Sequence, residues 1–144
     1  MYKISEIVQI FHPNRTFVTD PNSFVQHLFY DSRKIVQADN GIFFALQKNR
    51  DGHHYLKEAY ARGVRNFVLQ VDEQQEVELS GANIVWVEDS LVAMQALVTF
   101  HRQKFHYPVI GITGSNGKTI VKEWLFQLMS PEYKIYRSPK SYNS

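Results

Sequence analysis

Residues 109–119 read VIGITGSNGKT, an apolar run that ends in a glycine-rich turn followed by Lys118 and Thr119. Glycine lets successive backbone N–H groups turn toward a bound phosphate, while a lysine adds positive charge and a hydroxyl can ligate Mg²⁺. Such a loop needs a strand before it and a helix after it. The stretch therefore predicts a strand over 109–112, a phosphate-binding loop over 113–119 and an amphipathic helix over 118–129.

The loop departs from the usual phosphate-loop pattern at one position. The pattern G-x-x-x-x-G-K-[ST], aligned on Gly117, requires a glycine where this chain has Ile112. A glycine-rich turn without a ligand is the alternative, but Gly-Lys-Thr lies where phosphate binding needs it. The expected nucleotide-binding residues are Thr113, Gly114, Ser115, Asn116, Gly117, Lys118 and Thr119. Lys118 would reach the β- and γ-phosphates, and Thr119 would ligate Mg²⁺.

Composition narrows the class of protein. The chain has 144 residues, of which 44% are hydrophobic and 14% aromatic, enough for a packed core. Its 16 basic and 14 acidic residues leave a net charge of +2, which gives no case for a nucleic-acid surface. It contains no cysteine, and no apolar run has the length of a membrane span. We expect a cytoplasmic protein without a nucleic-acid or membrane partner.

Upstream of the loop, strand-like and helix-like stretches alternate. Helices are predicted over 4–11, over 54–62 and from an Asp89–Ser90 N-cap to Phe105; strands are predicted over 16–19, 24–30, 42–46, 66–69 and 84–87, with one more after the loop over 133–136. This alternation favours an α/β fold with a partly parallel sheet. Pro108 follows the long helix, so we place a domain boundary there, with domains at 1–107 and 108–144.

The loop T-G-S-N-G-K-T resembles the ATP loop of the Mur ligases, which use ATP to build the peptide stem of bacterial peptidoglycan. Two other stretches resemble the same family, in the same order. Asp31-Ser32-Arg33 precedes the segment GIFFAL at 41–46, and Asp51-Gly52-His53 precedes Ala59 and Gly63. The three stretches together cover most of the chain, so the resemblance is more specific than the loop alone.

The resemblance implies a fold and a domain arrangement. Residues 1–107 would be an N-terminal domain with a mixed sheet flanked by helices, which binds a UDP-linked muramyl peptide. Residues 108–144 would be the first strand, phosphate loop, helix and strand of a central ATPase domain. Mur ligases have three domains, so we expect this chain to be a truncated piece that is inactive alone. ATP and Mg²⁺ are the cofactors implied.

Within the family, Val121-Lys122-Glu123 after the loop resembles the ligase that adds D-alanyl-D-alanine to UDP-N-acetylmuramoyl-tripeptide through an acyl phosphate. Residues 137–144 resemble the ligase half of bifunctional proteins fused to an alanine racemase. Three alternatives remain open. They are the related ligase that adds the third stem residue, a non-catalytic nucleotide-sugar-binding module and a small stand-alone P-loop NTPase.

The resemblance also implies residues near the UDP moiety, namely Asp31, Ser32, Arg33, Asn49, Arg50, Asp51 and Asn143. Arg33 would pair with a phosphate, and Ser32 would hydrogen-bond the uracil or ribose. Alternatively, Asp31 and Arg33 pair with each other and fix the loop, and residues 49–51 form a solvated turn. We expect His53 to hydrogen-bond this loop.

Overall fold

A computed structural model of the chain describes residues 1–47, 51–71 and 77–138. The chain forms two compact units, Met1–Phe105 and His106–Ser144. The first unit ends two residues before the boundary expected from the sequence. The assignment of the two regions to a substrate domain and an ATPase domain stays a prediction.

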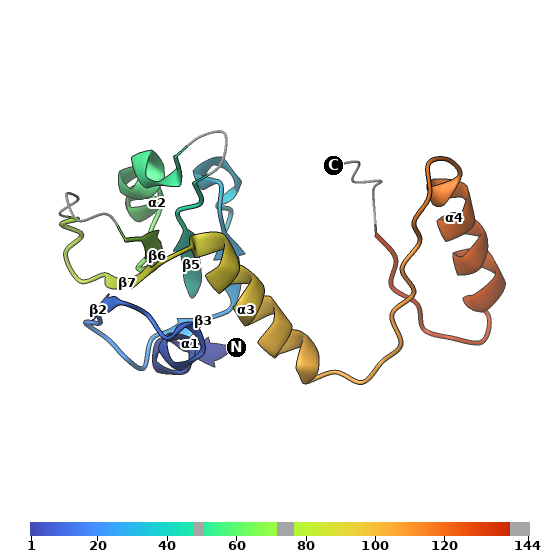
Figure 1. The fold of residues 1–144 in the computed structure, drawn as a ribbon, viewed down its shortest axis with the longest axis horizontal. Coiled ribbons are helices and arrows are strands. Elements are labelled where there is room, and N and C mark those ends of the chain that lie inside the picture. Colours follow the sequence, from blue (N-terminus) through green and yellow to red (C-terminus); the bar gives the residue numbers. More distant parts are fainter. Residues whose placement is uncertain (48–50, 72–76, 139–144) are drawn as a thin grey trace. The chain divides into compact units, whose positions relative to one another are not determined.

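The first unit is built on a mixed five-stranded sheet (Figure 1). Its strands lie in the order β2 (Arg15–Phe17), β7 (Asn83–Val87), β6 (Asn66–Gln70), β5 (Gly41–Phe44) and β4 (His27–Phe29). The strands β4, β5, β6 and β7 are parallel, whereas β2 runs antiparallel to β7. The predicted mixed sheet is confirmed.

The single strand expected over 24–30 is wrong, because this stretch forms two strands. β3 (Phe24–Val25) pairs with β1 (Tyr2–Lys3) in a separate antiparallel ribbon, and β4 joins the main sheet. Between them the backbone N–H groups of Gln26 and His27 both donate to the carbonyl of Asn40, at 2.7 and 3.2 Å. The partners of each half lie far apart in the sequence, so a local pattern cannot locate the break.

Alternating side chains give the sheet a core on each face. Ile42, Phe44, Val68 and Val85 pack on one face, with α1 (Ile4–Phe11) and α3 (Ser90–Gln103). Phe43, Phe67, Ile84 and Trp86 pack on the other, with α2 (Leu56–Ala61). All four residues of β5 are buried, as is typical of a strand covered on both faces of a sheet.

Of two predicted helix starts in this unit, the start of α3 is confirmed and the start of the α2 segment is not. Asp89 caps α3 as predicted, since its Oδ1 accepts from the N–H groups of Leu91 and Val92 at 2.7 and 3.0 Å. The helix expected over 54–62 starts instead as a 3-10 turn, Gly52–Tyr55, and continues as α2. Asp51 caps this turn through the N–H of His53, which draws the start of the helical segment back by two residues.

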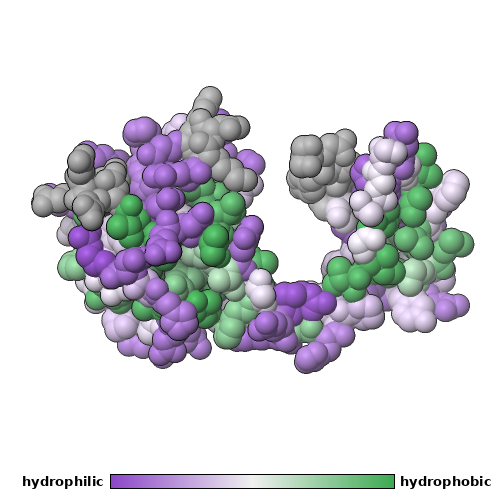
Figure 2. All heavy atoms as spheres, viewed as in Figure 1, coloured by the Kyte–Doolittle hydropathy of each residue, from purple (hydrophilic) through white to green (hydrophobic). Residues whose placement is uncertain are grey.

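The second unit contains α4 (Lys118–Met129), with the predicted bounds. The prediction of strands over 109–112 and 133–136 is wrong, because neither segment forms a β-strand. A strand needs a neighbour to pair with, and the described residues of this unit supply none. The apolar face expected of this amphipathic helix is not covered, since Val121 and Leu128 are 41% and 76% exposed. Figure 2 accordingly shows hydrophobic side chains on the surface of this unit.

Candidate functional site

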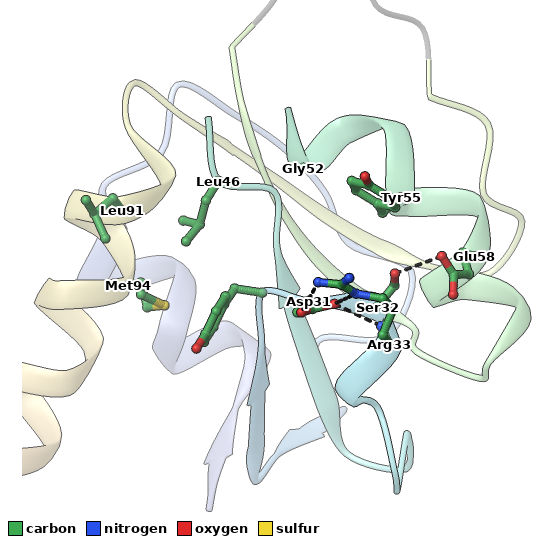
Figure 3. A pocket seen from close by; sticks show the side chains of 10 residues that line it. Asp31, Ser32, Arg33, Leu46, Gly52, Tyr55, Glu58, Leu91 and Met94 are labelled. Carbon is green, nitrogen blue, oxygen red and sulfur yellow. Dashed lines mark hydrogen bonds and ion pairs between the residues drawn. The ribbon is translucent and has the colours of Figure 1, made fainter. Parts of the chain in front are cut away.

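A cavity of about 750 Å³ opens in the first unit where β4 and β5 end (Figure 3). In sheets with parallel strands, ligands bind in the crevice beyond the carboxyl ends of the strands. The walls come from four segments: the turn after β4, the end of β5, the start of the α2 region and the first turns of α3. The lining residues are Tyr30, Asp31, Ser32, Arg33, Leu46, Gly52, Tyr55, Glu58, Leu91 and Met94.

The turn after β4 carries an ion pair. Asp31 caps a short 3-10 turn, Ser32–Lys34, by accepting from the N–H of Arg33 at 3.1 Å. The Arg33 guanidinium donates back through Nε and Nη2, at 2.9 and 2.8 Å, to the two carboxylate oxygens. This pair lowers the pKa of Asp31 to about 2. The structure thus forms the mutual pair that one interpretation requires, while phosphate binding by Arg33 stays a prediction.

Ser32, between the two partners of this ion pair in the sequence, is almost fully buried. Its Oγ donates to Oε2 of Glu58 on α2 at 2.8 Å. The other carboxylate oxygen of Glu58 accepts from Nη2 of Arg62 at 3.0 Å. The Ser32 hydrogen bond, followed by the Arg62 contact, lowers the pKa of Glu58. The contact between Ser32 and a uracil or ribose stays a prediction.

A second set of hydrogen bonds, made by His53, holds the α2 region against the sheet. Its ring is buried, and Nε2 accepts from the N–H of Gln70 at the end of β6, at 3.2 Å. The proton of the ring is therefore on Nδ1, which donates to Asp51 at 2.6 Å. Burial opposes ionisation of Asp51, but the hydrogen bonds from the backbone and ring of His53 outweigh it and lower the pKa of Asp51. The predicted hydrogen-bonding role of His53 is confirmed.

The remaining residues expected at the UDP end lie outside the described part of the chain. These are Asn49, Arg50 and Asn143. Conversely, the motifs did not identify Leu46, Tyr55, Glu58, Leu91 and Met94 as pocket residues. The i, i+4 pairing of Glu58 with Arg62 was visible in the sequence, but its contact with Ser32 depends on how α2 packs.

The predicted phosphate loop precedes α4 in the second unit. Gly114 and Gly117 have φ values of 145° and 77°, a region that favours glycine. Gly117 is the N-cap residue, and as a glycine it makes no side-chain cap hydrogen bond. Nζ of Lys118 folds back and donates to the carbonyl of Gly114. This arrangement favours binding of a phosphate group. It combines a helix start without a side-chain cap, two glycines with positive φ and a lysine that reaches across the loop.

The loop is accessible to solvent. Thr113, Ser115 and Asn116 are exposed. Within residues 1–47, 51–71 and 77–138, no three His, Cys, Asp or Glu side chains form a group that could hold a metal ion. Glu123 on α4 pairs with Lys122 and Arg137. Binding of Mg²⁺ by Thr119 stays a prediction.

No helix in these same three described ranges has the length and apolarity that crossing a lipid bilayer demands.

Comparison with known proteins gives close relatives for most of the chain. It is 32% identical over 123 residues to the UDP-N-acetylmuramoyl-tripeptide–D-alanyl-D-alanine ligase of Synechocystis sp., a match that covers 83% of this chain and 26% of that ligase. It is 36% identical over 98 residues to the UDP-N-acetylmuramoyl-L-alanyl-D-glutamate–2,6-diaminopimelate ligase of Alkaliphilus metalliredigens, covering 66% of this chain and 19% of that one. The chain therefore spans about a quarter or less of the length of these relatives. No model of a protein family matches it.

A solved structure shares the fold. The MurF ligase from Thermotoga maritima, determined in complex with ADP, superposes with a TM-score of 0.66 at 28% identity. That likeness covers 83% of this chain and 26% of the other chain.

Proposed function

Because the chain belongs to the Mur ligase family, we propose that it provides the UDP-substrate pocket and the ATP-phosphate loop of a ligase that joins D-alanyl-D-alanine to UDP-N-acetylmuramoyl-tripeptide. The observation that carries the proposal is the phosphate-loop geometry at the start of α4, in a chain with close relatives among these ligases. The Thermotoga ligase was determined in complex with ADP, which supports nucleotide binding by a ligase of this kind.

The loop suits the activation of a carboxylate by ATP. The terminal carboxylate of the tripeptide would attack the γ-phosphate of ATP, which releases ADP and forms an acyl phosphate. The amine of the dipeptide would then attack the acyl carbon, release inorganic phosphate and form the amide. The N-terminal end of α4 supplies a positive dipole end and backbone donors for phosphate oxygens. Lys118 would leave the Gly114 carbonyl and neutralise charge on the γ-phosphate, and Thr119 would ligate Mg²⁺. Positioning and charge neutralisation, rather than a protein nucleophile, would supply most of the catalysis.

The pocket in the first unit would receive the UDP end of the tripeptide substrate. Its walls combine apolar side chains, among them Leu46 and Met94, with the polar turn that contains Ser32. Such a mixture suits the uracil ring, which has apolar faces and polar atoms at its edge. We propose that the reaction takes place in the cytoplasm. The fusion to an alanine racemase stays a prediction, and reading the codons that follow residue 144 would test it.

The ligase that adds the third stem residue is the second candidate function. The Alkaliphilus relative, a diaminopimelate ligase, favours it through an identity of 36%. That match extends over 98 residues, whereas the match to the Synechocystis D-alanyl-D-alanine ligase extends over 123. The longer match is our reason to prefer D-alanyl-D-alanine.

An assay of the full-length gene product that contains this chain separates the two candidates. Phosphate release from ATP is measured with UDP-N-acetylmuramoyl-tripeptide plus D-alanyl-D-alanine, and separately with UDP-N-acetylmuramoyl-dipeptide plus diaminopimelate or lysine. We expect release only in the first mixture, and only when both the peptide and D-alanyl-D-alanine are present. Release in the second mixture alone would assign the other ligase, and release in neither would refute the proposed function.

A further inference from the structure

Glu58 is a charged residue in the cavity wall that the sequence motifs do not include. It lies on α2, yet its carboxylate reaches the turn after β4, where Oε2 accepts from Oγ of Ser32 at 2.8 Å (Figure 3). Ser32 is 2% exposed, so bulk water cannot readily replace this partner. Removing the carboxylate would leave a buried hydroxyl without its acceptor.

The position of Glu58 is itself fixed by the sheet. The 3-10 turn that leads into α2 is bound to the end of β5, because the N–H of Gly52 donates to the carbonyl of Leu46 at 2.9 Å. It is also bound to the end of β6, where the N–H of Gln70 donates to His53. Glu58 therefore stands on an element attached to two central strands, whereas the turn at 32–34 leaves the sheet after its edge strand β4.

We propose that Glu58 is a positioning residue for substrate binding: it holds Ser32, and through Ser32 the turn with Asp31 and Arg33, at the wall of the pocket. Ser32 lies between the two partners of the ion pair in the sequence. The Asp31–Arg33 pair by itself attaches the turn to nothing outside it, since both partners belong to the turn, whereas Ile35 after the turn is buried in the core. The bond to Glu58 ties this pair to the sheet through α2.

A simpler role for Glu58 would be the exposed ion pair with Arg62, one helical turn along α2. Both side chains of that pair are 42% exposed, and a surface pair of this kind contributes little to stability. This role predicts no effect of Glu58 on the turn at 31–33. The two roles can thus be separated by variants that remove one contact at a time.

The test measures the pKa of Asp31 by NMR titration of the 144-residue chain and its variants. Glu58→Ala removes a nearby negative charge, which alone would lower the pKa of Asp31 or leave it near 2. If Glu58 positions the turn, the Asp31–Arg33 pair loosens in Glu58→Ala, and the pKa of Asp31 rises toward its usual 3.8. Glu58→Gln keeps an acceptor for the hydroxyl of Ser32. In this variant the pKa of Asp31 should therefore stay at or below about 2.

Arg62→Ala and Glu88→Ala are the matched controls. Arg62→Ala removes only the outer partner of Glu58, and Glu88 is an exposed carboxylate in the bend between β7 and α3. Neither should raise the pKa of Asp31. If Glu58→Ala does not fold, Ser32→Ala removes the same bond from the other side and should also raise this pKa. A pKa of Asp31 that stays near 2 or falls in the folded Glu58→Ala or Ser32→Ala variant would overturn the proposal.

The effect of Glu58 on substrate binding rests on the proposed function. Steady-state kinetics of the full-length gene product test it. In Glu58→Ala we expect KM for the UDP-linked tripeptide to rise about tenfold, as for the loss of one hydrogen bond to a charged group, with KM for ATP unchanged. Glu58→Gln should restore KM, and adding Glu58→Ala to Ser32→Ala should raise it no further. If wild type shows no ligase activity, the proposed function fails and the Asp31 titration alone decides the role of Glu58.

Discussion

Gly52 is a residue whose replacement has a predictable cost. A Cβ built there would lie 2.7 Å from the backbone N of Leu46 and 2.8 Å from Cα of Ala45, both fixed at the end of β5. We expect Gly52→Ala to lower the free energy of unfolding by about 1–3 kcal/mol, the usual cost of overpacking. Urea denaturation measures it, with Gly111→Ala as control because a Cβ at Gly111 meets no atom within 4 Å. Equal stability of the two variants would contradict the close approach.

The ion pair of Asp31 predicts how the stability of the fold depends on pH. Its folded-state pKa, about 2, is below the usual 3.8 because of Arg33, so the carboxylate stabilises the fold above about pH 4 and loses that effect as pH falls toward 2. Wild type should therefore be more stable than Asp31→Asn at pH 6, and the gap should shrink between pH 4 and pH 2. Chemical denaturation at several pH values measures the gap. A gap that does not change with pH would contradict the ion pair.

At the scale of elements, the N-cap of α3 can be tested alone. The Asp89 carboxylate accepts from two N–H groups of the first turn. Asp89→Ala should cost about 1 kcal/mol of unfolding free energy, whereas Asp89→Asn retains an acceptor and should cost a few tenths at most. Thermal unfolding of both variants gives the comparison. A similar loss in both would show that charge, not capping, is what α3 needs.

The elements also show where prediction from sequence succeeds. α1 and α4 have their predicted bounds, because each has a local boundary signal, Pro13 after the first and Gly117 before the second. The strand expected over 24–30 was wrong because its halves pair with β1 and β5, which are remote from each other. The strands expected over 109–112 and 133–136 were wrong because a local apolar pattern cannot supply a pairing partner.

At the scale of the whole molecule, the site was only partly predictable. Asp31, Ser32 and Arg33 were expected through the resemblance, and they line the cavity. Glu58 and Met94 could not be found in the same way, because they come from different helices that the topology of the sheet brings to one edge. The turn before α4 was predictable, since its two glycines and the start of the helix are contiguous in the sequence, and phosphate binding by this turn stays a prediction.

The most direct test of the central claim, that the loop before α4 binds the phosphates of ATP in a ligase, is amide formation by the full-length gene product with Lys118→Ala. Mass spectrometry follows D-alanyl-D-alanine joined to the UDP-linked tripeptide. Lys122→Ala is the control, because Lys122 lies on the same helix as Lys118 but contacts Glu123 and the carbonyl of Ser138. We expect Lys118→Ala to reduce the rate at least about 100-fold, as when a charge-stabilising group is lost, and Lys122→Ala to change it little. A folded Lys118→Ala variant as active as wild type would contradict the claim.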